Sequence, residues 1–101
     1  MLLIHATSRD RVERPQGIRQ CGLKRKYAKM KRKAVWGVPA HDIDAALRHI
    51  AKKKVPLSQI VFCHINVPDE WCRAHGDGSF YVDHDIPVEM IRLEALFRGG
   101  I

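Results

Sequence analysis

The sequence contains no hydrophobic run long enough to cross a membrane and no closely spaced pair of cysteines. A membrane-spanning helix needs about 20 predominantly apolar residues, and the apolar stretch at residues 1–4 is too short even for a signal peptide. Cys21, Cys63 and Cys72 form no C-x-x-C pair, and their odd number leaves at least one thiol unpaired. These absences argue against an integral membrane protein and a disulfide scaffold, and they predict a location in the reducing cytoplasm.

Acidic residues are scarce in the first half of the chain. Residues 1–54 hold 15 of the 18 Lys and Arg residues but 4 of the 11 Asp and Glu residues, a balance of +11. The remaining residues hold 3 basic and 7 acidic side chains, a balance of −4. A local basic excess indicates an anionic macromolecule as partner: RNA, DNA or an acidic protein surface.

The chain does have enough apolar side chains to fill one core. Its 101 residues, 46% of them hydrophobic, fit a single domain over residues 1–101. Runs of high β propensity alternate with turn signals. We expect strands at residues 1–5, 34–38, 60–67, 79–82 and 91–97, and a short helix at residues 9–13. This pattern predicts an α+β domain with a mixed or antiparallel sheet.

The main helix is expected over residues 40–54. Ile43, Leu47 and Ile50 fall on one face of such a helix. Asp42 and Asp44 lie in its first turn and three lysines lie in its last, and both placements suit the helix dipole.

Residues 24–33 form a basic segment with seven Lys or Arg side chains in ten positions. The apolar spacing permits a helix with one narrow apolar stripe, whereas like-charge repulsion favours a loop. Both conformations remain open. Cations at this density neutralise phosphates, and an interleaved tyrosine can stack on an unpaired base. The predicted nucleic-acid-binding residues are Lys24, Arg25, Lys26, Tyr27, Lys29, Lys31, Arg32 and Lys33. The alternative is a solubilising loop.

Two further groups of side chains are candidates for a small-molecule site. His5 and Thr7, two positions apart on the first strand, are expected to project together and to hydrogen-bond a ribose or a phosphate. Trp36, next to Gly37, can offer an aromatic face to a planar ring. The alternatives are a polar strand end with Thr7 as a helix cap, and core packing of the indole.

Histidines and cysteines are spread along the second half of the chain. They include no second closely spaced pair, so we expect no metal site. The candidate ligands considered are Cys63, His64, Cys72, His75 and His84. His5 and His64 are also each followed two residues later by a polar side chain, a minor indication of a phosphodiesterase with one histidine as base and one as acid.

In this order, the motifs resemble the ADP-ribosyltransferase-like superfamily, which includes small bacterial and phage proteins and the RNA 2'-phosphotransferases. The resemblance spans most of the chain, and its motifs are short. They are L-I-H-A-T-S at residues 3–8, Gly22-Leu23, V-W-G-V at 35–38, V-F-C-H-I-N-V-P at 61–68, G-S-F-Y-V at 78–82 and D-I-P-V-E-M-I at 85–91.

This resemblance implies NAD as the ligand and the transfer of ADP-ribose as the reaction. By the resemblance, His5 and Thr7 hold the NAD ribose and Trp36 packs against nicotinamide. The family's late glutamate has no counterpart at residues 77–82, where Asp77 is the acidic residue. Asp77 is therefore the candidate that steadies the cationic ribosyl group.

Three interpretations follow from the sequence. The first is an ADP-ribosyltransferase-like domain that binds NAD and modifies a macromolecule recruited by residues 24–33. The second is the same fold without catalysis, a phage-type inhibitor that binds nucleic acid or protein through that segment. The third is a small RNA-processing enzyme.

Overall fold

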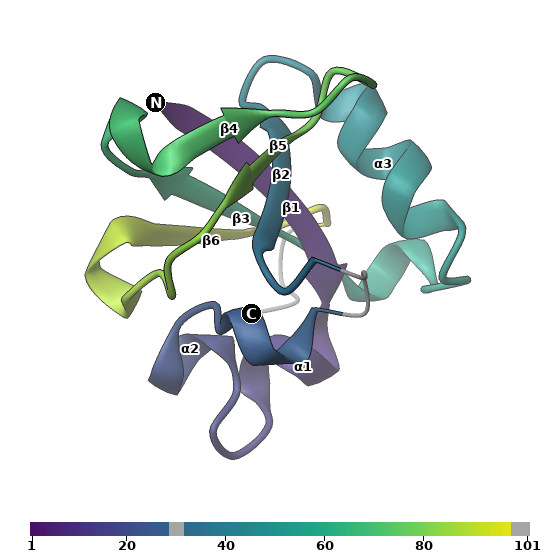
Figure 1. Ribbon diagram of the computed structural model, residues 1–101. Coiled ribbons are helices and arrows are strands. Elements are labelled where there is room, and N and C mark those ends of the chain that lie inside the picture. Colours follow the sequence, from purple (N-terminus) through teal and green to yellow (C-terminus); the bar gives the residue numbers. More distant parts are fainter. Residues whose placement is uncertain (29–31, 98–101) are drawn as a thin grey trace.

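A computed structural model describes residues 1–28 and 32–97 of the chain (Figure 1). Within these residues, three α-helices accompany a six-stranded antiparallel sheet with the strand order β4-β5-β2-β1-β3-β6. The predicted α+β class is confirmed, with the sheet antiparallel throughout. In the part of the chain that is described, no helix has the length and apolar character needed to span a membrane.

The sheet is built from strands that the alternating sequence pattern largely anticipates. They are β1 (Leu2–Ser8), β2 (Val35–Pro39), β3 (Ile60–Asn66), β4 (Cys72–Ala74), β5 (Phe80–Val82) and β6 (Ile91–Ala95). β1 and β3 pair along their whole length, from Leu2 opposite Asn66 to Ser8 opposite Ile60. The short strand β4 was not among the strands expected from the sequence.

Each face of the sheet packs against its own helices. On one face, Leu3, Val61 and Cys63 form a core with Val12 of α1 (Arg9–Glu13) and Ile18 of α2 (Ile18–Cys21). On the other face, apolar residues of β1, β2 and β3 pack against α3 (Ile43–Ala51). Figure 1 shows α3 at the right of the sheet and α1 and α2 below it. The central strands are thus buried on both faces, which explains their nearly continuous apolar sequence.

The helix α3 is shorter than the predicted 40–54. It begins after Asp42, whose side chain accepts a hydrogen bond from the backbone N–H of Ala45 (3.1 Å), the usual role of an N-cap aspartate. The predicted face was partly wrong, because Ile43 is 43% exposed and Ala45, Ala46 and Ile50 are the buried residues. Alanine at these positions permits a close approach of helix and sheet.

The first helix has its predicted bounds, and its N-cap is Ser8. Ser8 accepts a hydrogen bond from the Arg11 N–H (3.3 Å), and Thr7 belongs to β1. Short 3₁₀ turns connect several of the other elements. They are η1 (Arg25–Tyr27), η2 (Leu57–Gln59), η3 (Asp69–Trp71) and η4 (Val88–Met90).

The strands β1 and β2 pair over a short distance only. Leu3 lies opposite Pro39 and Ile4 lies opposite Val38, and no further residue pair continues the ladder. By contrast, β1 continues along β3 as far as Ser8, and β2 continues along β5 as far as Val35. The two central strands therefore diverge beyond Ile4 and Val38, in the middle of an otherwise continuous sheet.

Candidate functional site

A cleft of about 750 Å³ occupies the place where β1 and β2 diverge. Its walls come from both strands, from α1 and the chain that follows it, from the end of α3 and from the loop before β5. His5 and Trp36 both line it, as the nucleotide-site prediction requires. The volume falls within the roughly 300–1,000 Å³ of small-molecule sites. The fold thus provides a ligand-sized cleft at the residues that sequence analysis singled out.

His5 spans the gap between the diverging strands. Its Nδ1 lies 2.8 Å from the backbone carbonyl oxygen of Trp36. A carbonyl only accepts hydrogen bonds, so the proton resides on Nδ1 and Nε2 presents a lone pair. Burial lowers the pKa of His5 to about 4, with the bond to the carbonyl opposing the shift and nearby cations adding to it. At pH 7 the His5 ring is therefore uncharged and its Nε2 can accept a hydrogen bond. It is a poor general acid, and the bond to the Trp36 carbonyl fixes its orientation.

Trp36 is partly buried within a small aromatic cluster. The His75 ring meets the indole edge-on at 5.2 Å between centroids, and the Tyr81 ring is tilted at 5.3 Å. Indole Nε1 is buried, and no residue in the described ranges offers it a hydrogen-bond acceptor. A buried N–H without a partner is uncommon, and this donor belongs to a residue that lines the cleft.

The rim of the cleft is strongly basic. Arg11 and Arg14 contribute from α1 and its end, Lys24 from the start of the basic segment, and Lys52 and Lys53 from the turn after α3. Among the described lining residues, these cations face a single carboxylate, which belongs to Asp77. A cleft lined by one sign of charge concentrates ligands of the opposite sign. The electrostatics of the cleft therefore suit a phosphate-bearing ligand.

Asp77 lies in an exposed turn at the cleft mouth. Its Oδ1 accepts hydrogen bonds from the Ser79 backbone N–H (3.0 Å) and hydroxyl (2.5 Å). These bonds lower the pKa of Asp77 below its ordinary value, so the side chain is a carboxylate at neutral pH. Asp77 was predicted as the acidic residue that stands where the family resemblance implies a late glutamate. It lines the same cleft as His5 and Trp36.

Thr7 does not join the other predicted site residues. It is 3% exposed and is absent from the cleft lining, and it lies in the part of β1 that pairs with β3, opposite Val61. The expectation that His5 and Thr7 act together in ligand binding therefore needs correction. Residues two apart share a face of a strand, but only His5 borders the gap.

The two-histidine interpretation also needs correction. His5 lies opposite Cys63 in the β1–β3 ladder, and His64 lies opposite Ile4. The two imidazoles consequently point to opposite faces of the sheet. His64 instead places Nε2 2.9 Å from Glu94 Oε1 on β6. They cannot serve as the acid and base of one reaction.

The basic segment is only partly available to a partner. Lys24 and Tyr27 line the cleft, whereas the Arg25 N–H donates to Asp85 (2.8 Å) and its guanidinium donates to the Asp83 carbonyl (3.0 Å). These contacts tie the segment to the acidic second half of the chain.

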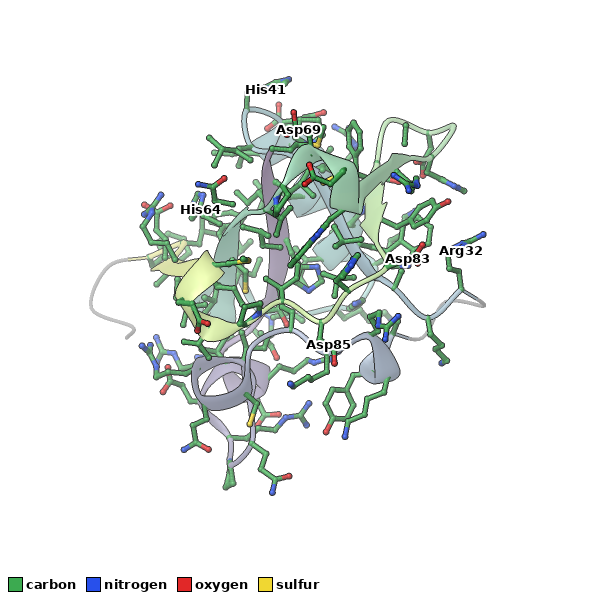
Figure 2. All side chains as sticks on the ribbon, turned by 60° about the vertical axis from the view of Figure 1, so that its left-hand side comes forward. Arg32, His41, His64, Asp69, Asp83 and Asp85 are labelled. Carbon is green, nitrogen blue, oxygen red and sulfur yellow. The ribbon has the colours of Figure 1, made fainter. Side chains whose placement is uncertain are left out.

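The other predicted cations of this segment have varied surroundings. Arg32 stacks over Tyr81 at 4.6 Å and approaches Asp83 at 4.0 Å. Figure 2 shows Arg32 and Asp83 at the right of the molecule. Lys26 lies 5.1 Å from the ring centroid of Tyr27, and Lys33 Nζ donates to the Ala28 carbonyl. Lys29 and Lys31 lie outside the described residues.

The cysteines and histidines considered as ligands are dispersed. Cys63 is fully buried, and burial raises the pKa of its thiol to about 12. His84 stacks on Trp71 at 4.2 Å between nearly parallel rings. Across residues 1–28 and 32–97, no group of three or more potential ligands is placed to hold a metal ion.

Several cleft residues were missed by the sequence analysis. Arg11, Arg14, His49, Lys52 and Lys53 come from two helices on opposite faces of the sheet and meet only because the sheet opens between β1 and β2. Their high local charge was visible in the sequence, but their convergence depends on long-range pairing.

Comparison with family models, curated proteins and solved structures gave no match to this chain.

Proposed function

We propose that the cleft binds NAD and that the protein transfers the ADP-ribose part of NAD to a macromolecular acceptor. One observation carries this proposal. His5 and Trp36, bonded through the Trp36 carbonyl, line one cleft of about 750 Å³ whose rim is basic. A dinucleotide needs all three of these features: an acceptor for ribose hydroxyls, a surface for a planar ring, and cations for the pyrophosphate.

Each group has a role that follows from its chemistry. The Nε2 lone pair of His5 accepts a hydrogen bond from a ribose hydroxyl, and the indole of Trp36 packs against the nicotinamide ring. Arg11, Arg14 and Lys24 compensate the charge of the pyrophosphate. Asp77 contributes negative charge where the ribosyl carbon becomes positive.

The transfer is a substitution at the ribosyl carbon that carries nicotinamide. The bond between this carbon and the nicotinamide nitrogen breaks, and nicotinamide leaves with the bonding electrons. A nucleophile of the acceptor forms the new bond and gives up one proton to solvent water. Cationic charge builds up as nicotinamide departs, so a carboxylate at this position lowers the barrier.

The alternative is a non-catalytic module that binds RNA, DNA or an acidic protein surface through residues 24–33. The contacts of Arg25 and Arg32 with Asp83 and Asp85 weigh against it, because these cations are already partly compensated. The third interpretation, an RNA-processing enzyme, loses its acid–base pair because His5 and His64 lie on opposite faces.

Calorimetric titration with NAD tests the proposal. The wild-type protein is expected to bind NAD, and His5→Ala is expected to lose at least about tenfold in affinity, a loss of one or more buried hydrogen bonds. His41→Ala serves as the matched control, because His41 is exposed and lies outside the cleft lining. Absence of NAD binding by the folded wild type, or equal losses in the two variants, would overturn the proposal.

Trp36 provides a second readout. Trp71→Phe leaves Trp36 as the only tryptophan of the chain, and NAD is expected to quench its fluorescence. Trp36→Phe leaves Trp71, which packs on His84 away from the cleft lining, and its fluorescence is expected to remain unchanged. Quenching in the second variant alone would place the ligand elsewhere.

A further inference from the structure

The strand β6 forms one edge of the sheet and pairs only with β3 in the described structure. Figure 1 shows it beside β3. An open edge offers unpaired backbone groups to another strand, and natural proteins block such edges with Pro, Lys, bulges or very short strands. β6 reads Ile-Arg-Leu-Glu-Ala over five residues and has neither Pro nor Lys, whereas the opposite edge strand β4 has three residues.

The backbone groups that face outward from β6 can be identified from the ladder. The Leu96 N–H donates to the Ile60 carbonyl at 3.0 Å, so this pair is a hydrogen-bonded one. Hydrogen-bonded and non-bonded pairs alternate along an antiparallel ladder, so Glu94 and Arg92 bond to β3 in turn. The N–H and C=O groups of Ile91, Leu93 and Ala95 therefore point away from the sheet.

These outward groups match a second copy of the same strand. If two β6 strands run antiparallel about a two-fold axis at Leu93, Leu93 lies opposite Leu93 of the second copy, and Ile91 lies opposite its Ala95. All of these residues present outward backbone groups, so each opposed pair exchanges two hydrogen bonds. A two-fold interface of this kind buries the same surface on both chains and closes on itself.

The side chains of β6 are self-complementary in this register. Arg92 and Glu94 are exposed and share one face of the strand. Pairing about Leu93 places Arg92 opposite Glu94 of the second copy, and Glu94 opposite its Arg92. Glu94 is held over this face by His64, whose Nε2 lies 2.9 Å from Oε1. Opposite charges across a ladder are stabilising and like charges are destabilising.

The surroundings of β6 have room for an added strand. A hollow of about 910 Å³ runs along β6. Its walls include Ile18 and Val88 as well as Ile91 and Leu93, and the exposed Ile43. Ile18, Ile91 and Leu93 belong to the core face of the sheet, the face that Ile91, Leu93 and Ala95 of a second copy would extend.

We propose that two copies of this chain associate through their β6 strands, antiparallel and centred on Leu93, to form one continuous sheet. The occupant of the edge is thus a second copy of the protein. Three features support this dimer: the outward backbone groups, the unlike charges that the register brings together, and the apolar residues among those that line the hollow beside the strand. It is independent of the ligand proposed for the cleft.

Charge exchange tests the register. Sedimentation equilibrium from about 10 µM to about 1 mM is expected to show a monomer–dimer equilibrium for the wild type, as suits a small interface. Arg92→Glu and Glu94→Arg, taken singly, each place like charges opposite one another twice and are expected to weaken the dimer about tenfold or more. The double variant Arg92→Glu/Glu94→Arg restores unlike pairs and is expected to dimerise again.

Mixing the two single variants supplies the decisive control. One carries two acidic side chains on β6 and the other two basic ones, so a heterodimer is expected although neither variant dimerises alone. This rescue also shows that both variants fold. A wild type that remains monomeric to about 1 mM would overturn the proposal, as would a dimer that is insensitive to the single substitutions or a double variant that remains monomeric.

Discussion

The imidazole Nδ1 of His5 lies 2.8 Å from the carbonyl oxygen of Trp36, across the gap where β1 and β2 cease to pair. This single bond replaces the ladder that the two strands would otherwise continue. It fixes the neutral tautomer of His5, and it holds the Trp36 backbone against the cleft. Because burial keeps this ring neutral in the folded protein, the stability of the protein should depend on pH.

His5 is expected to lower the stability of the protein in acid. Its pKa is about 4 in the folded state against 6.5 for an ordinary histidine, so the unfolded chain binds more protons between these values. The free energy of unfolding therefore falls as the pH drops from about 6.5 to about 4. His5→Gln, which cannot titrate, should remove about 2 kcal/mol of the loss between pH 7 and pH 4.5. Urea unfolding of both proteins at the two pH values measures this difference.

His49→Gln is the matched control for this measurement, because it replaces a second histidine of the same cleft by the same residue and this histidine is exposed. This variant should retain more of the acid loss than His5→Gln does. An identical pH dependence in His5→Gln and wild type would mean that His5 titrates normally in the folded protein.

The elements that could be predicted are those with a strong local signal. β3 was predicted from a run of high β propensity at residues 60–67, and it occupies Ile60–Asn66. The main helix was recognised from its apolar periodicity and from the acidic residues of its first turn. α2 and β4 were missed because each is a few residues long, and the contacts that stabilise them are distant in sequence.

The candidate site was predictable in part for a related reason. His5, Trp36 and Asp77 were named from local motifs, and all three line the cleft. Thr7 was named by strand periodicity alone, which does not show where a sheet opens. The basic rim from α1 and α3 was missed because it depends on the divergence of β1 and β2, a property of register that no local pattern reports.

Gly22 is expected to be the least replaceable glycine of the cleft wall. Its φ of 77° and ψ of −165° belong to a region that side chains avoid. An added Cβ would meet the Ile86 carbonyl oxygen at 2.1 Å, and that oxygen accepts the Leu23 N–H. Gly22→Ala should therefore cost at least about 3 kcal/mol of stability, measured by urea unfolding.

Gly78→Ala distinguishes backbone strain from the contact with Ile86 as causes of this loss of stability. Its φ is 88°, but nothing lies within 4 Å of an added Cβ. Gly78→Ala should cost only the backbone term, about 1–2 kcal/mol. Equal losses in the two variants would show that the contact with Ile86 contributes nothing.

Substitution of Lys24 and of Lys26 tests whether the anion binds in the cleft or along the basic segment. Lys24 lines the cleft, whereas Lys26 is exposed and stands over the Tyr27 ring. Lys24→Gln should weaken NAD binding about two- to fivefold, the value of one solvated charge contact, and Lys26→Gln should leave it unchanged. Calorimetry at low and at physiological salt measures both. Equal effects would indicate diffuse attraction by the segment as a whole.

Asp77 should affect the reaction without affecting the binding of NAD. Its carboxylate is ionised, because the two hydrogen bonds from Ser79 lower its pKa. Asp77→Asn retains an oxygen that accepts both bonds but removes the charge. Since the charge acts on the cationic ribosyl group, the rate of nicotinamide release from NAD should fall about 10²–10³-fold, the usual effect of deleting one such group.

Asp83→Asn is the control, because Asp83 lies outside the cleft lining, 4.0 Å from Arg32. A rate that is unchanged in Asp77→Asn, or reduced equally in both variants, would remove Asp77 from the reaction.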